Sequence, residues 1–80
     1  MKLDIVTPDE SIYSGKIKLI KVPGTQGSFE VLKNHAAIIS TLDKGTIKVI
    51  DEADNEQFFN IEKGLIEVNH NNIIVLLEKI

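Results

Sequence analysis

The sequence predicts an all-β fold, a two-sheet sandwich or a barrel of about eight short strands joined by short hairpin connections. Apolar residues recur at every second position, as at Leu3 and Ile5, which is the period of a half-buried strand. Clusters of turn-forming residues separate these stretches at intervals of about eight to twelve residues. Helical alternatives are weak, because only residues 29–42 are long enough and unbroken, and residues 38–41 within them are mostly β-branched.

The expected strands follow one another along the chain. Alternating apolar residues mark them at Leu3/Ile5, Ile17/Leu19, Ile47/Val49, Phe59/Ile61 and Ile66/Val68. The turn-rich segments between them are residues 7–10, 23–27, 43–45, 51–55, 63–64 and 69–72. We interpret the acidic segment 51–54 as a solvated hairpin tip, and we expect at most one helical turn, near residues 33–35.

Two segments, residues 36–39 and 73–77, are apolar on both faces. A strand that is buried on both sides needs cover on both sides. One face fills the core, which leaves residues such as Ile74 and Leu76, together with Phe58, available to a partner protein. A loop of the same chain is an equally good candidate for this cover.

Eighty residues predict a single domain, residues 1–80, and its stability depends on packing alone because the chain contains no cysteine. The longest uncharged apolar run, residues 73–77, is far too short to cross a bilayer, so we expect a soluble, unprocessed chain. The net charge is −3 and every basic residue is a lysine, so the bidentate arginine contacts typical of nucleic-acid recognition are missing. Nucleic acid is therefore not an expected partner.

The sequence carries no recognisable catalytic or metal-binding pattern. Nucleophilic catalysis needs a histidine beside a hydroxyl and a carboxylate, and only His35 and His70 are present. We expect a solvated hairpin position for His70 and a contact or structural role for His35. Residues 24–28 look like a phosphate loop but lack the Gly-Lys-Ser/Thr ending and a following helix. We expect no enzyme activity of its own, no metal and no cofactor.

Several motifs, in order, resemble the N-terminal domain of the ATP synthase epsilon subunit. They begin with the strand LDIVTP at residues 3–8 and the glycine loop VPGTQGSF at residues 22–29. NHA at residues 34–36, IISTL at residues 38–42 and KG at residues 44–45 are similar to the family's histidine, apolar strand and glycine turn. FNI, GLIEV and IIVLL, which begin at residues 59, 64 and 73, match its closing hairpins. The resemblance covers essentially the whole chain.

The resemblance implies a two-sheet antiparallel β-sandwich of about ten short strands that acts as a non-catalytic rotor subunit in the central stalk. It implies binding to the gamma subunit and to the membrane c-ring, which couples rotation and proton transport to ATP synthesis at the cytoplasmic face of the bacterial inner membrane. Contact with the membrane would occur only through the ring, and the isolated chain is expected to be a monomer. The family's inhibitory C-terminal helical hairpin is absent from residues 1–80, so inhibition through such helices is not expected.

The resemblance also assigns two surfaces. The loop expected to face the c-ring consists of Gln26, Gly27, Ser28, Phe29, Glu30, Val31 and Leu32. The residues expected to face gamma are His35, Ile38 and Ser40. On this assignment, Phe29→Asp is expected to weaken attachment to the ring.

Two other protein classes fit a small all-β chain. Lipoyl or biotinyl carrier domains present a modified lysine at a hairpin tip, and Lys44 within residues 43–45 is the candidate here. The residues before it disfavour this interpretation, because carriers place the lysine in a more acidic hairpin or beside methionine. An oligonucleotide-binding barrel is disfavoured by the acidic balance and the few aromatic residues.

Overall fold

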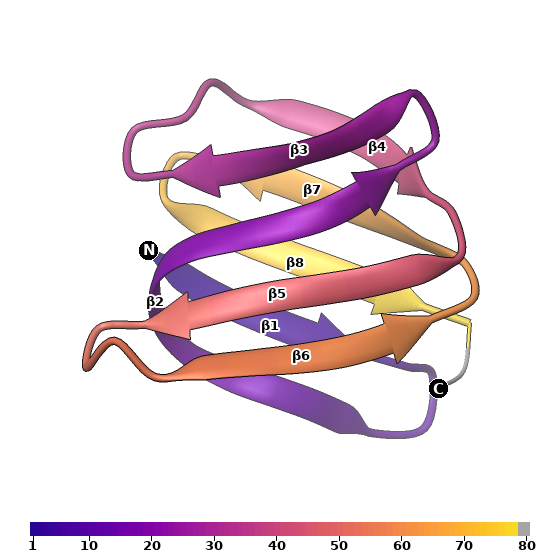
Figure 1. The fold of residues 1–80 in the computed structure, drawn as a ribbon, viewed down its shortest axis with the longest axis horizontal. Coiled ribbons are helices and arrows are strands. Elements are labelled where there is room, and N and C mark those ends of the chain that lie inside the picture. Colours follow the sequence, from indigo (N-terminus) through magenta and orange to yellow (C-terminus); the bar gives the residue numbers. More distant parts are fainter. Residues whose placement is uncertain (79–80) are drawn as a thin grey trace.

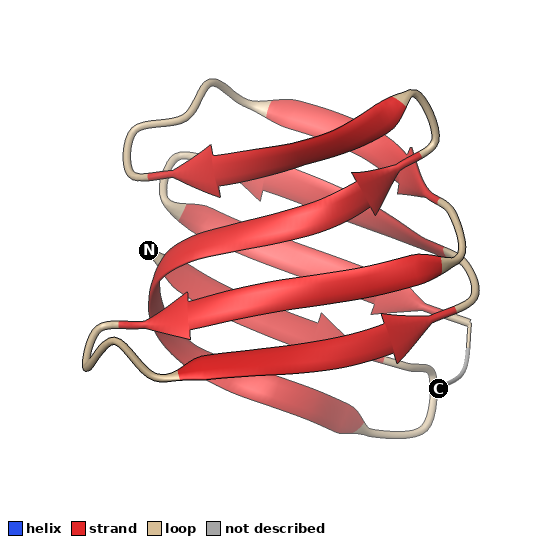
Figure 2. Cartoon of the chain, viewed as in Figure 1, coloured by secondary structure: helices blue, strands red, loops and turns tan. Residues whose placement is uncertain are grey.

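The structure, a computed structural model, describes residues 1–78. Within that part of the chain there are strands and turns and no helix (Figure 2). The strands are β1 (Lys2–Val6), β2 (Ser11–Gly24), β3 (Gly27–Leu32), β4 (Ile38–Leu42), β5 (Gly45–Asp51), β6 (Glu56–Ile61), β7 (Gly64–Asn69) and β8 (Asn72–Leu77). Lys79 and Ile80, which complete the expected domain, lie outside the described residues.

The strands form two layers, which confirms the all-β sandwich (Figure 1). The front layer has the order β3, β2, β5, β6, and the back layer has the order β4, β7, β8, β1 followed by the first part of β2. Neighbouring strands are antiparallel except β1 and β8, which pair in parallel. The first and last strands therefore lie side by side in the back layer.

Strand β2 belongs to both layers. Its first part pairs with β1, where Lys16 lies opposite Lys2, and its second part pairs with β5 and β3. The register shifts between Ile17 and Leu19, which is where the strand passes from one layer to the other. The resemblance implied about ten strands and eight are described, one of which, at 14 residues, serves both layers.

The core between the layers is entirely apolar in the described part of the chain, where no polar or charged side chain is buried. Because successive side chains of a strand point to opposite faces, each strand contributes alternate residues to this core. The buried residues are Leu3, Ile5, Ile17, Ile20, Val22, Val31, Leu42, Ile47, Val49, Ile61, Ile66, Val68, Ile73, Val75 and Leu77.

The alternation expected around Ile17 and Leu19 is interrupted. Ile17 is buried as expected, but Leu19 is only half-buried, and Ile20 and Val22 are the next residues in the core. The register shift after Ile17 is the physical reason, because one extra residue in a strand moves the following side chains to the other face.

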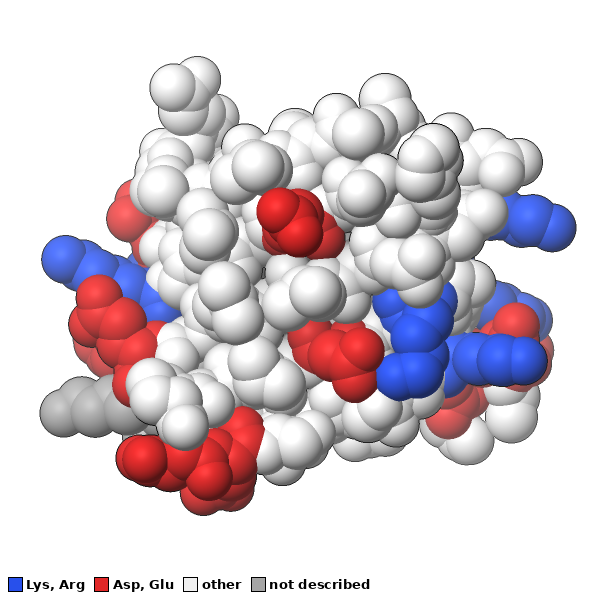
Figure 3. Space-filling model, turned by 180° about the vertical axis from the view of Figure 1, so that it is seen from behind, with Lys and Arg blue, Asp and Glu red and all other residues white. Residues whose placement is uncertain are grey.

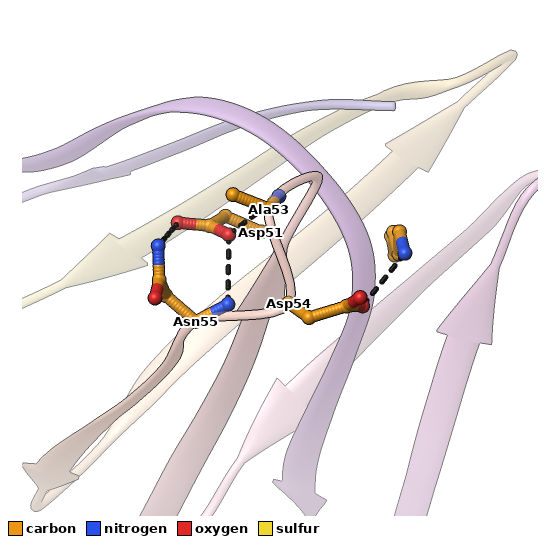
Figure 4. A network of polar contacts seen from close by, with 5 residues as sticks. Asp51, Ala53, Asp54 and Asn55 are labelled. Atoms are coloured by element: carbon orange, nitrogen blue, oxygen red, sulfur yellow. Dashed lines mark hydrogen bonds and ion pairs between the residues drawn. The ribbon is translucent and has the colours of Figure 1, made fainter.

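The turns satisfy their own backbone groups. In the β5–β6 hairpin, the carboxylate of Asp51 accepts hydrogen bonds from the backbone N–H groups of Ala53 (2.9 Å) and Asn55 (3.0 Å) (Figure 4). The hydrogen bond from the Asn55 backbone is the main reason that the pKa of Asp51 lies below its ordinary value of 3.8. Lys18 and Asp54 form an ion pair of 2.6 Å beside this turn. Residues 52–55 are exposed, as expected for a solvated hairpin tip.

We predict that Ile66→Val lowers the free energy of unfolding by about 0.5–1.5 kcal/mol, because Ile66 is fully buried and the lost methylene leaves a cavity. Urea denaturation of the purified chain measures the change. Ile39→Val is the matched control, since Ile39 also lies in a strand but is 66% exposed. Equal effects of the two substitutions would contradict the placement of Ile66 in the core.

Candidate functional site

The residues expected to face the ring lie on the turn and second strand of the β2–β3 hairpin. Gln26 and Gly27 are exposed at the turn. Along β3, the side chains of Ser28, Glu30 and Leu32 point away from the core, and Leu32 is 52% exposed. These five residues form a continuous outer surface of the hairpin.

The other two residues of this set point inward. Val31 is fully buried, so its side chain has no surface to offer a partner. Phe29 is half-buried and packs against the core, with its ring close to the backbone of Gly24. A charge at position 29 would therefore disturb the packing of the hairpin as well as any contact made by it.

The residues expected to face gamma lie on β4 and on the connection before it. His35 is half-buried, its backbone N–H donates to the carbonyl oxygen of Leu32 (3.1 Å), and its Nδ1 lies 2.7 Å from the carbonyl oxygen of Ala36. This turn takes the place of the single helical turn allowed near residues 33–35. Ile38 and Ser40 are half-buried on the same face of β4.

The structure brings the two expected surfaces together at one rim of the sandwich. Strands β3 and β4 lie at this rim, β3 at the edge of the front layer and β4 at the edge of the back layer (Figure 1). An open groove of about 620 Å³ lies between them. It is lined by residues of the turn and β3, including Gln26, Ser28 and Phe29, and by Ile38 and Ser40 of β4. His35 does not line this groove.

The outer face of the back layer carries an exposed apolar patch that begins at β4. Ile39 is 66% exposed, Leu76 46% and Ile74 39%. Leu65 lies opposite Leu76 in the strand register, and Leu76 lies opposite Val6, so these apolar side chains are neighbours across the strands. Ile39 and Ile74 are separated by Glu67, an exposed residue that lies opposite both of them. Figure 3 shows this face from behind, where acidic groups stand among uncharged side chains in the middle of the face. We define the back-face patch as Val6, Ile39, Leu65, Ile74 and Leu76.

The patch answers a question that the sequence left open. Ile74 and Leu76 alternate with buried residues on β8 and remain exposed, so no described loop covers them. Phe58, the third residue of that group, is 61% exposed but lies on β6 in the front layer. The sequence therefore identified exposed residues correctly but could not show that they lie on opposite faces.

A polar cluster borders the back-face patch on β1. The carboxylate of Asp4 accepts hydrogen bonds from the Ser14 hydroxyl (2.8 Å) and from the Lys2 ammonium (3.1 Å). Both interactions favour the ionised carboxylate and lower the pKa of Asp4 below its ordinary value of 3.8, with the Ser14 hydrogen bond contributing most. In the register of the sheet Asp4 lies opposite Ile74, so the cluster fixes a charge directly beside apolar surface.

Other candidate chemistry is not assembled among residues 1–78. No group of three or more potential ligands is placed to hold a metal ion in this part of the chain. His70 is exposed in the β7–β8 turn with a positive φ of 54°. Lys44 lies where the chain crosses from β4, which pairs with β7, to β5, which pairs with β2 and β6, and not at a hairpin tip. Residues 1–78 contain no helix that is long and apolar enough to cross a membrane.

The whole chain matches a known protein family. Residues 1–80 match the family described as ATP synthase, Delta/Epsilon chain, beta-sandwich domain. An ATP synthase epsilon chain of Chlorobium limicola is 37% identical over 79 residues, which cover 99% of this chain and 90% of that protein. An epsilon chain of Campylobacter jejuni is 42% identical over 77 residues, which cover 95% of this chain and 59% of that protein.

Solved structures share the fold at lower sequence identity. A chain in the Euglena gracilis mitochondrial ATP synthase, solved with OSCP, F1 and c-ring, aligns with a TM-score of 0.89 at 22% identity and covers 96% of this chain and 49% of that one. A chain in the central stalk and c-ring of the Tetrahymena thermophila mitochondrial ATP synthase aligns with a TM-score of 0.81 at 14% identity, covering 98% of this chain and 63% of that one. At these identities the comparison shows the fold.

We predict that Asp4→Asn lowers the free energy of unfolding at neutral pH and that this difference disappears in acid. The folded-state pKa of Asp4 lies below the ordinary 3.8, so its contribution is fully present above about pH 4 and is lost as the pH falls through the folded-state pKa. Urea denaturation of both proteins between pH 7 and pH 2 measures it. A difference that stays constant over this range would exclude the ionised carboxylate as its source.

Proposed function

Because the chain belongs to the family of ATP synthase delta/epsilon chain β-sandwich domains, we propose that it is a non-catalytic rotor subunit that links the gamma subunit to the c-ring. The family match over residues 1–80 is the observation that carries this proposal. In this role the domain rotates with its partners and couples proton flow to ATP synthesis. Such a task requires a stiff body that is bonded on two surfaces, and it requires no reactive side chain.

The physical properties of the described residues support this role. A close-packed apolar core resists deformation, and the core here contains no buried polar group within residues 1–78 that could bring in water. Exposed apolar surface stands beside the strands that the resemblance assigns to partners. Exposed apolar side chains grouped on one face are typical of protein interaction sites.

We place gamma on the side of β4. Ile38 and Ser40, expected to face gamma, lie on this strand, and its outward side chain Ile39 belongs to the back-face patch. A partner that contacts the edge of β4 would extend onto Ile39 and Leu65 and would meet the exposed carboxylate of Glu67, which lies opposite Ile39. The polar cluster around Asp4 would then lie at the margin of that contact.

We place the c-ring on the outer surface of the β2–β3 hairpin. The exposed side chains there are Gln26, Ser28, Glu30 and Leu32, a mostly polar set that suits the polar loops of a ring. Phe29 and Val31 support the hairpin from inside. The effect first expected for Phe29→Asp therefore combines loss of packing with loss of contact, and an exposed position makes a cleaner test.

Two further statements belong to this proposal. We propose that residues 1–80 do not restrain ATP hydrolysis, because the family's inhibitory element is helical and the described residues form strands and turns. We also propose a peripheral position on the cytoplasmic face of the bacterial inner membrane, where contact with the membrane is made only through the ring. The carrier alternative loses support, since Lys44 lies at a crossing between layers.

We predict that the chain co-purifies with gamma and that Ile39→Lys weakens this association by at least about tenfold. The reason is that burying an isoleucine side chain contributes about 1.5–3 kcal/mol, and a lysine charge in its place must also be desolvated. Titration of labelled gamma with the purified chain measures the affinity. Thr46→Lys is the matched control, because it adds the same charge to an exposed strand position in the front layer. Equal affinities of the two variants would refute the placement of gamma at β4.

We predict that Ser28→Trp lowers coupled ATP synthesis. Ser28 is exposed, so the added ring obstructs the outer surface of the hairpin without entering the core. The measurement is ATP synthesis driven by a proton gradient in liposomes that contain the reconstituted enzyme. Thr46→Trp adds the same ring elsewhere in the front layer and should leave synthesis at the wild-type rate. Normal synthesis with Ser28→Trp would place the ring contact on another surface.

A further inference from the structure

The rim that carries both expected surfaces is closed at one end by main-chain hydrogen bonds. Gly24 at the end of β2 pairs with Leu42 at the end of β4, which joins the front layer to the back layer. The backbone N–H of Thr25 donates to the carbonyl oxygen of Thr41 (3.1 Å), and the backbone N–H of Asp43 donates to the carbonyl oxygen of Pro23 (2.8 Å). We call this junction the corner clamp and define it as Pro23, Gly24, Thr25, Thr41, Leu42 and Asp43.

A side-chain hydrogen bond reinforces the corner clamp. The hydroxyl oxygens of Thr25 and Thr41 lie 2.8 Å apart, so one hydroxyl donates to the other across the junction. Thr25 belongs to the turn of the ring-facing hairpin, and Thr41 follows Ser40 on the strand assigned to gamma. The two residues therefore connect the proposed surfaces directly.

The corner is also too crowded to take side chains at two glycines. A Cβ atom at Gly24 would lie 2.7 Å from the carbonyl oxygen of Gly27 and 2.8 Å from the ring of Phe29. A Cβ atom at Gly45, just after the clamp, would lie 2.8 Å from the Cβ of Pro23. All three distances are shorter than the contacts that real Cβ atoms make, so the close approach of the two layers depends on glycine here.

The opposite rim is closed in a different way. There the front layer ends at β6 and the back layer ends at the first part of β2. Tyr13 and Phe59 meet across this rim edge to face, with ring centroids 6.0 Å apart. The corner clamp therefore differs from this rim in being held by directional hydrogen bonds between the two layers.

We infer that Thr25 and Thr41 are a positioning pair, which holds the ring-facing hairpin in a fixed orientation on the gamma-facing strand and passes torque between the two surfaces. This inference rests on the proposed function, because it concerns how the two partner surfaces are joined. Without the pair, each surface still binds its own partner. The hairpin then bends relative to the gamma-facing strand when the rotor works against a proton gradient, and part of the rotation is not passed from one surface to the other.

The first test measures the corner clamp in the isolated full chain. Replacing Thr41 with valine keeps the β-branched shape and removes the hydrogen bond between the two hydroxyl groups. The net contribution of such a bond corresponds to about a fivefold change in the equilibrium between the closed and the opened corner clamp. We expect the amide protons of Thr25 and Asp43 to exchange with solvent about fivefold faster in Thr41→Val, and Thr41→Ser to restore the wild-type rate. Thr46→Val is the matched control, because it removes a comparable hydrogen bond, from Thr46 to Asn60 (2.9 Å), which joins two strands of the front layer and does not join the two layers.

The second test measures coupling in ATP synthase reconstituted with each variant. We expect Thr25→Val and Thr41→Val to lower the number of protons pumped per ATP hydrolysed, with the subunit retained in the complex at the wild-type level and with Thr46→Val unchanged. Unaltered amide exchange, or altered exchange with unaltered coupling, would overturn the inference. Loss of the variant subunit from the complex would overturn it too, because the pair would then serve binding. Failure of the wild-type chain to bind gamma would instead overturn the proposed function.

Discussion

The constraint that governs this structure is that two small sheets must enclose one apolar core without any covalent cross-link. The chain contains no cysteine, and a chain of this length buries only about 60% of the surface that it exposes when unfolded. Strand β2 meets the constraint by belonging to both layers, and the pairing of Gly24 with Leu42 closes the layers again at its far end. The positions of the hairpin, the groove and the back-face patch all follow from this double connection.

The same alternation that builds the core also creates the surfaces. On β8 every second side chain is buried, and the residues between them, Ile74 and Leu76, are as apolar as their buried neighbours. A strand needs only one apolar face to fill a sandwich, so the second apolar face on β8 has no role inside the domain. A binding role for that face accounts for its composition and agrees with the rotor function proposed for the chain.

The fold was largely predictable because period-two alternation and turn residues are local signals. Leu3, Ile5, Ile66 and Val68 alternate without interruption and all lie in the core. Leu19 was placed wrongly, because the register shift after Ile17 depends on the passage of β2 between layers, which no local pattern reveals. The parallel pairing of β1 with β8 was missed for the same reason: it joins segments that are far apart in the sequence.

The candidate site was predictable only as a set of segments. The resemblance named residues 26–32 as one block, but a strand alternates, and the structure separates inward Phe29 and Val31 from outward Ser28, Glu30 and Leu32. The groove between β3 and β4 and the contact of Thr25 with Thr41 required the topology. Hydroxyl residues at turns and strand ends are common, so nothing in the sequence marked this pair as special.

The central place of β8 has a consequence for how the protein is made. This strand lies between β7 and β1 and pairs with both, so the back layer is divided into two parts until residues 72–77 have been synthesised. While the ribosome is still adding these residues, β1 can pair only with β2, and the apolar inner faces of both layers stay open to solvent. Long-range pairing of this kind forms slowly and leaves a nascent chain vulnerable to aggregation. The back layer can therefore become one continuous sheet only after β8 has been synthesised, and the apolar inner faces are open to aggregation until then.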